Sequence, residues 1–444
     1  MKTFAIVSLG CPRNLVDSEV IAGSLKAKGF ISLPLEKGVD VAVINTCAFV
    51  ESAREESVEA VIEAGDLKRR GKIGYLIICG CLGQLYKERL ADELPEADLV
   101  IGTSDFPKIA GLLEGLGKRK ERSIVSRRLD FLYDDSSPRL SLTPAHYAYV
   151  KISEGCSNRC SYCIIPNLRG DLRSRRVESV VAEVRNLARG GKMKEIELIG
   201  QDTTVFGTDR YGKAALPGLL RSLCALENGI RWIRLLYTHP AHYSEELIDV
   251  IAGEKKICKY LDLPIQHISD KMLRLMNRKS GRKDIERLIG SLRKRAPGIV
   301  LRTSVIVGFP QETDNDFREL LDFLKNVKFD RLGAFIYSRE SSTAASRMKG
   351  QVSEDVKSRR YAEVMRLQQE ISAAANRKYI GRTVDVLIDE KVALEDNKFI
   401  GRTEGDAPEI DGVVHVTAKG ARTGNFCKVK IKDTLEYDLI GEKA

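Results

Sequence analysis

Three cysteines stand close together near the middle of the chain. Cys156, Cys160 and Cys163 have the spacing C-x3-C-x2-C, and no fourth cysteine or histidine lies beside them. A structural zinc ion takes four protein ligands, and a ferredoxin-type cluster takes four thiolates. Three thiolates in one short loop instead suit a [4Fe-4S] cluster that keeps one iron open for a substrate. The spacing therefore predicts a catalytic cluster.

This loop resembles that of the radical S-adenosylmethionine (SAM) enzymes. In that family the amino and carboxylate groups of SAM bind the open iron, and electron transfer from the cluster cleaves SAM to methionine and a 5′-deoxyadenosyl radical. The resemblance implies that Tyr162, the aromatic residue before the third cysteine, lies near the adenine.

The first third of the chain alternates strands with helices. This order predicts a doubly wound parallel sheet, an α/β fold. The predicted strands are Thr3–Ser8, Asp40–Asn45, Ile73–Cys79 and Asp98–Ile101, and the predicted helices are Asn14–Lys28, Glu51–Arg70 and Leu82–Leu94.

Cysteines follow three of these strands. Cys11, Cys47 and one of the pair Cys79 and Cys81 lie in loops that leave the carboxyl ends of the strands, where ligand sites form in such sheets. Three converging thiolates predict a second cluster with an open iron, although isolated buried cysteines are also common. Cys81 is the better ligand, because Cys79 lies inside an apolar strand and Gly80 lets the backbone turn before Cys81.

The middle of the chain reads as six β/α units, which predicts a partial barrel with its chemistry at the carboxyl ends of the strands. Predicted strands are Ala148–Ser153, Glu195–Ile199, Arg231–Tyr237, Lys259–Leu263, Val300–Val307 and Arg331–Tyr337; predicted helices are Val177–Arg189, Pro217–Glu227, Ser244–Gly253, Lys271–Arg295 and Asp314–Asn326.

Polar residues at the carboxyl ends of these strands could contact SAM. They are Gly200-Gln201-Asp202, Gln266-His267 and Gly308-Phe-Pro-Gln-Glu312. For Gln266 and His267, ordinary loop capping is an equally good interpretation. Four arginines after the cluster loop could meet an acidic substrate group or belong to the solvated surface: Arg169, Arg173, Arg175 and Arg176.

The last part of the chain changes character. A polar linker helix over Ser353–Lys378 precedes five short alternating runs, which predict a small β-barrel. The runs are Val384–Asp389, Lys398–Arg402, Val413–Thr417, Cys427–Lys432 and Tyr437–Ile440. Three isolated cysteines, Cys224, Cys258 and Cys427, are expected to be structural.

Composition fits a cytoplasmic, multidomain enzyme. The 444 residues contain ten cysteines, no apolar run of membrane-spanning length and no signal peptide, so we expect metal ligands and free thiols rather than disulfides. The predicted domains are 1–143, 144–376 and 377–444. The net charge of +10 is concentrated in the middle domain, with 40 basic and 28 acidic residues, which favours a polyanionic neighbour such as RNA or a ribosome, or else a lysine-rich solvated surface.

The whole chain resembles the methylthiotransferase family of radical SAM enzymes, and within it the RimO branch. The motifs that carry the resemblance are Ser8-Leu-Gly-Cys-Pro-Arg-Asn-Leu-Val-Asp-Ser-Glu19, Lys151-Ile-Ser-Glu-Gly-Cys, Ile164-Ile-Pro-Asn-Leu-Arg-Gly-Asp-Leu-Arg-Ser174 and Asp406-Ala-Pro-Glu-Ile-Asp-Gly412. The chain departs from the family at Gln311, where Gly is usual. The resemblance implies a TRAM-type terminal barrel, two [4Fe-4S] clusters, held by Cys11, Cys47 and Cys81 and by Cys156, Cys160 and Cys163, and SAM as both radical source and methyl donor.

The resemblance also implies the reaction: a methylthio group is added to the β-carbon of an aspartate in ribosomal protein S-twelve, free or within the small ribosomal subunit. A reductant such as flavodoxin or ferredoxin and a sulfur donor would be further partners. The alternative is a tRNA methylthiotransferase (MiaB-like), whose Gly-Cys-Gln start and Arg-Gly-Glu-Glu run are absent. Residues 377–444 carry 12 basic and 13 acidic side chains, and the acidic loop 404–411 predicts a surface for a basic protein rather than for RNA.

Overall fold

The computed structural model describes residues 2–118 and 120–444, and these divide into two compact units. The first unit comprises the chain up to Leu142 together with Lys151–Arg159 and Cys163–Val180. The second comprises Thr143–Val150, Cys160–Tyr162 and Val181–Ala444. Among the described residues, no helix is both long enough and apolar enough to cross a membrane.

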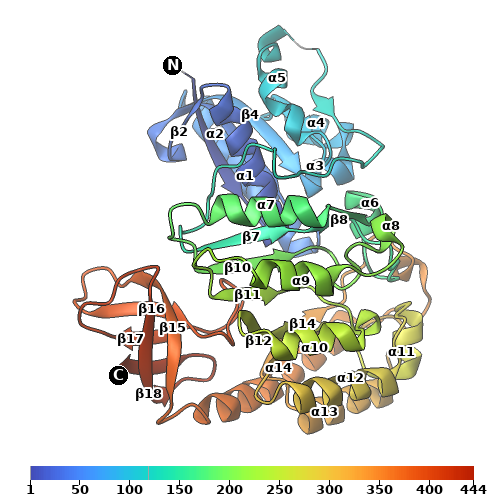
Figure 1. The fold of residues 1–444 in the computed structure, drawn as a ribbon. Coiled ribbons are helices and arrows are strands. Elements are labelled where there is room, and N and C mark those ends of the chain that lie inside the picture. Colours follow the sequence, from blue (N-terminus) through green and yellow to red (C-terminus); the bar gives the residue numbers. More distant parts are fainter. Residues whose placement is uncertain (1, 119) are drawn as a thin grey trace. The chain divides into compact units, whose positions relative to one another are not determined.

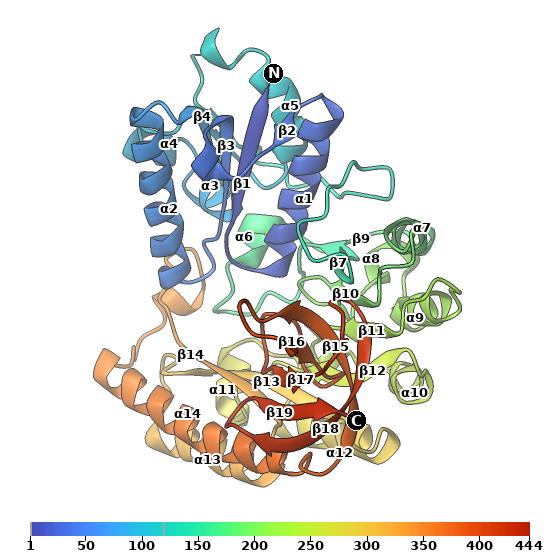
Figure 2. The same ribbon diagram turned by 90° about the vertical axis from the view of Figure 1, so that its left-hand side faces the viewer.

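The first unit contains a six-stranded sheet in the order β2-β1-β3-β4-β5-β6, and every strand pair is parallel. Figure 2 shows helices α1 and α2 on opposite faces of this sheet, so the predicted doubly wound fold is confirmed. The strands are β1 Thr3–Ser8, β2 Ile31–Ser32, β3 Val39–Thr46, β4 Ile73–Gly80, β5 Leu99–Ile101 and β6 Ser123–Ile124; the helices are α1 Pro12–Ala27, α2 Glu51–Arg69, α3 Cys81–Tyr86, α4 Glu88–Glu93 and α5 Ile109–Leu113.

Two helices that were predicted as continuous are interrupted. The stretch 82–94 is two short helices, because Lys87 has a φ of 53° that the right-handed helix does not allow. The stretch 271–295 is likewise split, since Asn277 has a φ of 55°. Apolar periodicity continues across both breaks, so the pattern of side chains did not reveal them.

The second unit contains a six-stranded sheet in the order β14-β13-β12-β11-β10-β7. Figures 1 and 2 show α9, α10, α12 and α13 along the outer side of this curved sheet, which is the predicted partial barrel. The strands are β7 Tyr147–Lys151, β10 Glu195–Ile199, β11 Trp232–Leu235, β12 Ile257–Asp262, β13 Val300–Val307 and β14 Arg331–Ile336; the helices are α7 Val177–Leu187, α8 Thr208–Tyr211, α9 Leu216–Cys224, α10 Glu245–Gly253, α11 Asp270–Leu275, α12 Arg282–Arg295 and α13 Asp314–Val327.

The long helix α14 (Glu354–Arg377) leads from this sheet to a closed five-stranded barrel in the order β15-β16-β17-β19-β18. Alternate residues of these strands point inward and form a buried apolar core, among them Val386, Val416 and Val429. The strands are β15 Thr383–Lys391, β16 Lys398–Arg402, β17 Val414–Thr417, β18 Phe426–Thr434 and β19 Leu439–Lys443.

In the acidic loop between β16 and β17, the predicted exposed surface is wrong for two of the four carboxylates, Asp406 and Asp411, whereas Glu404 and Glu409 are exposed. Asp406 is 2% exposed and pairs with Arg331 at 2.8 Å, and Asp411 lies 3.4 Å from Arg302. Both arginines lie toward the amino ends of sheet strands. Further contacts to the loop are Tyr147 Oη to Glu409, Tyr149 Oη to the Pro408 carbonyl, Arg234 Nη1 to the Glu404 carbonyl and Tyr260 Oη to Asp411.

These contacts come from five of the six strands, β7, β11, β12, β13 and β14. The loop 403–412 therefore closes the amino end of the partial barrel. Charge counting along the sequence missed this role, because it does not show which acidic side chains are neutralised by partners far away in the chain.

We expect Asp406→Lys to destabilise the protein strongly. Removing one partner of a buried ion pair costs about 3–5 kcal/mol, and here it would also place two cations side by side. The measurement is the thermal unfolding midpoint, with Glu390→Lys on an exposed barrel position as the matched charge reversal. Equal midpoints for the two variants would contradict the buried role of Asp406.

Candidate functional site

The first candidate centre is the set Cys11, Cys47 and Cys81. Cys11 is the N-cap of α1, Cys47 follows β3 directly, and Cys81 begins α3 after β4. Strands β1, β3 and β4 are neighbours in the sheet, so their carboxyl ends bring these residues to one edge. Gly10 permits the close approach, because a Cβ at this position would lie 2.7 Å from Cys47 Sγ.

The ionisation of these thiols reflects their proximity. Burial, together with the neighbouring Cys81 and Cys11 thiols, raises the pKa of Cys47 to about 11. Burial would also raise the pKa of Cys11, but the guanidinium of Arg13, whose Nε donates to Cys11 Sγ at 3.4 Å, lowers it below its ordinary value. Three thiols that repel one another as thiolates are suited to share a cationic ligand.

Cys79 is different from its neighbour Cys81. It lies inside β4 and is fully buried, and burial raises the pKa of its thiol far above the ordinary value. Cys81 is partly exposed, and its sulfur accepts a hydrogen bond from Arg169 Nη2 at 3.4 Å. These environments favour Cys81 as the third ligand.

The loop from Gly155 to Ile164 carries the second set of cysteines. Gly155 has a φ of 79°, and a Cβ there would lie 2.1 Å from the carbonyl oxygen of Asp171, so only glycine fits. The Cys156 N–H donates to the Gly170 carbonyl at 3.0 Å. In the first unit, a backbone hydrogen bond therefore joins the start of the loop to the segment 170–171 that follows it.

In the second unit, Arg278 lies against the remaining part of the loop. Its Nη1 is 3.8 Å from Cys160 Sγ and 3.5 Å from the Tyr162 hydroxyl, and its Nη2 donates to the Pro264 carbonyl at 2.7 Å. Tyr162 also packs against an apolar group that includes Met276. The sequence did not single out Arg278, because nothing in its spacing distinguishes it from the other basic residues around it.

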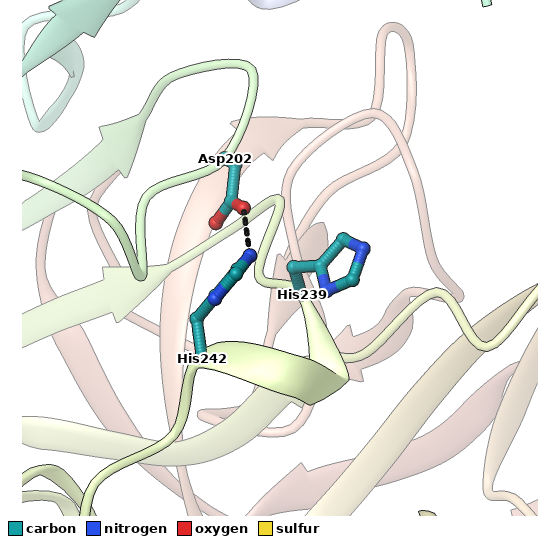
Figure 3. A group of neighbouring side chains, drawn as sticks. All are labelled: Asp202, His239 and His242. Carbon is teal, nitrogen blue, oxygen red and sulfur yellow. Dashed lines mark ion pairs between the residues drawn. The ribbon is translucent and has the colours of Figure 1, made fainter. Parts of the chain in front are cut away.

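A group of polar side chains lies at the carboxyl ends of β10 and β11 (Figure 3). The Nε2 of His242 faces Asp202 at 3.7 Å, and His239 lies beside them. Burial, followed by the nearby Arg278, lowers the pKa of His239 to about 2, and its Nδ1 already accepts the Ala241 N–H. Arg278 and Lys279 place positive charge near the group and this nitrogen is already engaged, so the arrangement disfavours a bound cation.

The contacts of His267 distinguish between its two interpretations, SAM contact and loop capping. It is fully buried, its Nδ1 accepts the Ser269 N–H at 3.0 Å, and its Nε2 lies 3.1 Å from Glu312. Both ring nitrogens are engaged within the protein, so loop capping is the correct interpretation. Gln311 has a φ of 67°, a conformation that favours glycine, so the backbone here keeps the geometry that suits the usual glycine although the side chain differs.

The four arginines after the cluster loop have different environments. Arg169 and Arg175 are buried, and Arg175 donates to the Lys151 carbonyl and to Ser179. Arg173 is half-buried and donates to backbone carbonyls, whereas Arg176 is exposed. Arg169 and Arg175 therefore belong to the protein interior, which neither predicted alternative had anticipated.

Both sets of cysteines fit a [4Fe-4S] cluster with one open iron. Each set offers three thiols, and in each unit a buried guanidinium lies beside one of the sulfurs, Arg169 at Cys81 and Arg278 at Cys160. Such hydrogen bonds stabilise a negatively charged thiolate cluster.

Three known families match most of the chain. The Radical SAM superfamily matches residues 150–324, the Uncharacterized protein family UPF0004 matches 3–102, and the TRAM domain matches 380–443. Among solved structures, the radical SAM methyltransferase TsrM from Kitasatospora setae has a TM-score of 0.59 at 16% identity and covers 78% of this chain and 74% of its own. This likeness concerns the fold alone.

The fold and the cysteine loop thus define a radical SAM enzyme with an added cysteine-bearing domain and a TRAM barrel. Proteins named ribosomal protein uS12 methylthiotransferase RimO are 46% identical in Clostridioides difficile (strain 630), over 100% of this chain and 99% of the relative, and 47% identical in Geobacter sulfurreducens, over 99% and 98%. The chain belongs to the RimO family of radical SAM methylthiotransferases. Its cofactors are two [4Fe-4S] clusters and SAM.

Proposed function

We propose that this chain adds a methylthio group to the β-carbon of an aspartate in ribosomal protein uS12. The names of its relatives support the methylthio transfer and the protein uS12. The observation that carries this proposal is the presence of two separate sets of three cysteines in one chain. An unactivated C–H bond resists acid–base chemistry, so one centre is needed to make a radical and the other to supply sulfur.

Each part of the chain has a role in this proposal. The domain 144–376 holds the radical-forming cluster through Cys156, Cys160 and Cys163, and Tyr162 and Gln201 contact SAM. The domain 1–143 holds the sulfur-bearing cluster through Cys11, Cys47 and Cys81. The barrel 377–444 contributes to substrate recognition. It does so through its outer surface, apart from the loop 403–412 that packs against the central sheet.

When bound, the central cluster and SAM supply a carbon radical that can abstract hydrogen from the substrate. The protein's own task is to hold the cysteines, orient SAM and exclude water from the radical. The remaining partners are a reductant such as flavodoxin or ferredoxin and a sulfur donor, in the cytoplasm, and the basic middle domain would tolerate nearby ribosomal RNA.

The test is mass spectrometry of ribosomal proteins and of tRNA nucleosides from cells with and without this chain. We expect ribosomal protein uS12 to gain the mass of one methylthio group in place of one hydrogen on a single aspartate, only when the chain is present. A change in tRNA nucleosides with unmodified uS12 would overturn the proposal in favour of a tRNA substrate.

A further inference from the structure

Four buried charged side chains form a closed network in the first unit. Lys151 Nζ lies 2.5 Å from Asp17 Oδ1 and 2.6 Å from Glu154 Oε2, and Arg169 Nη1 lies 2.5 Å from Asp17 Oδ2 and 3.4 Å from Glu154 Oε2. All four side chains are at most 8% exposed. Two carboxylates face two cationic side chains, so the charges of the network compensate one another away from water.

The members of this network come from both cysteine-bearing segments. Asp17 lies in α1, which begins next to Cys11. Lys151 and Glu154 precede Cys156 in the sequence, and Arg169 ends the short helix α6 (Ile165–Arg169) that follows Cys163. The network therefore joins the flanks of the C-x3-C-x2-C loop to the helix that begins at the first-domain cysteines.

Arg169 also reaches the first-domain cysteines directly. While its Nη1 pairs with the carboxylates, its Nη2 donates to Asn14 Oδ1 at 3.2 Å and to Cys81 Sγ at 3.4 Å. A guanidinium can make these contacts together because its donors have a fixed, forked geometry, which an ammonium group lacks.

The electrostatic consequence concerns the cluster that Cys81 would hold. Reduction adds one negative charge to a cluster, and in a buried environment a neighbouring cation stabilises the reduced form more strongly than it would in water. Arg169 therefore favours reduction. Asp17 opposes reduction, because its carboxylate lies 2.5 Å from Arg169 Nη1 and so places a negative charge next to the guanidinium that contacts Cys81.

We propose that Arg169 and Asp17 set the reduction potential of the first-domain cluster with opposite signs, and that Arg169 is a positioning residue shared by the two cysteine-bearing segments. This inference rests on the proposed function, because it takes Cys11, Cys47 and Cys81 as the ligands. Arg169 belongs to the radical SAM segment, yet it would influence the reduction potential of the cluster in the first domain.

The test uses the full-length variant Cys156→Ala, Cys160→Ala, Cys163→Ala, which leaves only the first-domain set. Its reduction potential is measured by a redox titration followed by electron paramagnetic resonance. We expect Arg169→Gln to make the potential more negative and Asp17→Asn to make it more positive. Arg169→Lys, which keeps the charge, should shift it less than Arg169→Gln, and Arg176→Gln on the exposed surface of the same segment should leave it unchanged.

A single substitution that leaves a buried charge unbalanced could prevent folding. The double variant Arg169→Gln, Asp17→Asn removes one charge of each sign, so it should fold and return the potential toward that of the parent. A parent that binds no iron would refute the ligand assignment itself. A parent that binds a cluster, with a potential that neither Arg169→Gln nor Asp17→Asn moves, or that both move in the same direction, would overturn this inference alone.

Discussion

Replacing Cys156, Cys160 and Cys163 together by alanine is expected to remove about half of the bound iron and to abolish SAM cleavage. The reason is that the loop supplies all three protein ligands to its cluster, and SAM needs the open iron of that cluster for binding and for the electron. Iron analysis of the anaerobically reconstituted protein and detection of 5′-deoxyadenosine measure the two effects.

The matched control is Cys224→Ala, which removes a thiol from the end of α9, away from both sets in the sequence. It should retain full iron content and SAM cleavage. If the triple variant kept the iron content of the unmodified protein, the assignment of the loop as a cluster site would be wrong.

Replacing Cys11, Cys47 and Cys81 by alanine should have the complementary result. We expect SAM cleavage to continue, because the radical is formed at the other cluster, whereas transfer of the methylthio group to the substrate falls below detection. The measurement pairs 5′-deoxyadenosine formation with mass spectrometry of the substrate protein.

Cys79→Ala provides a demanding control for this variant, because Cys79 lies two residues from Cys81 and is buried inside β4. It removes a sulfur from the strand that leads directly to Cys81, and we expect the second cluster and methylthio transfer to survive. Loss of the cluster in Cys79→Ala together with its retention in Cys81→Ala would reverse the choice within this pair.

The position of the first-domain cysteines could be anticipated because parallel strands place their carboxyl ends at one edge. Cys11, Cys47 and Cys81 each follow a strand that the apolar pattern predicted, and their thiols lie near enough to influence one another's pKa. Local pattern and topology were sufficient here, because neither depends on a partner far along the chain.

Long-range ion pairs could not be anticipated in the same way. Arg169 looked like a surface or substrate-binding residue, yet its partner Asp17 lies 152 residues earlier. Asp406 looked exposed, yet Arg331 neutralises it from 75 residues away. A charged residue in a sequence has no visible partner, so only the folded structure distinguishes a solvated charge from a buried and compensated one.

The docking of loop 403–412 limits how this protein could have evolved by recombination. Exchanging the terminal barrel for one from another protein would leave Arg302 and Arg331 at the amino end of the sheet without their carboxylate partners. The loop of the barrel and the arginines that pair with it in the central sheet must therefore be inherited together. With the proposed role of the barrel in substrate recognition, new substrate preferences would arise by point changes on its outer face, not by exchange of the whole barrel.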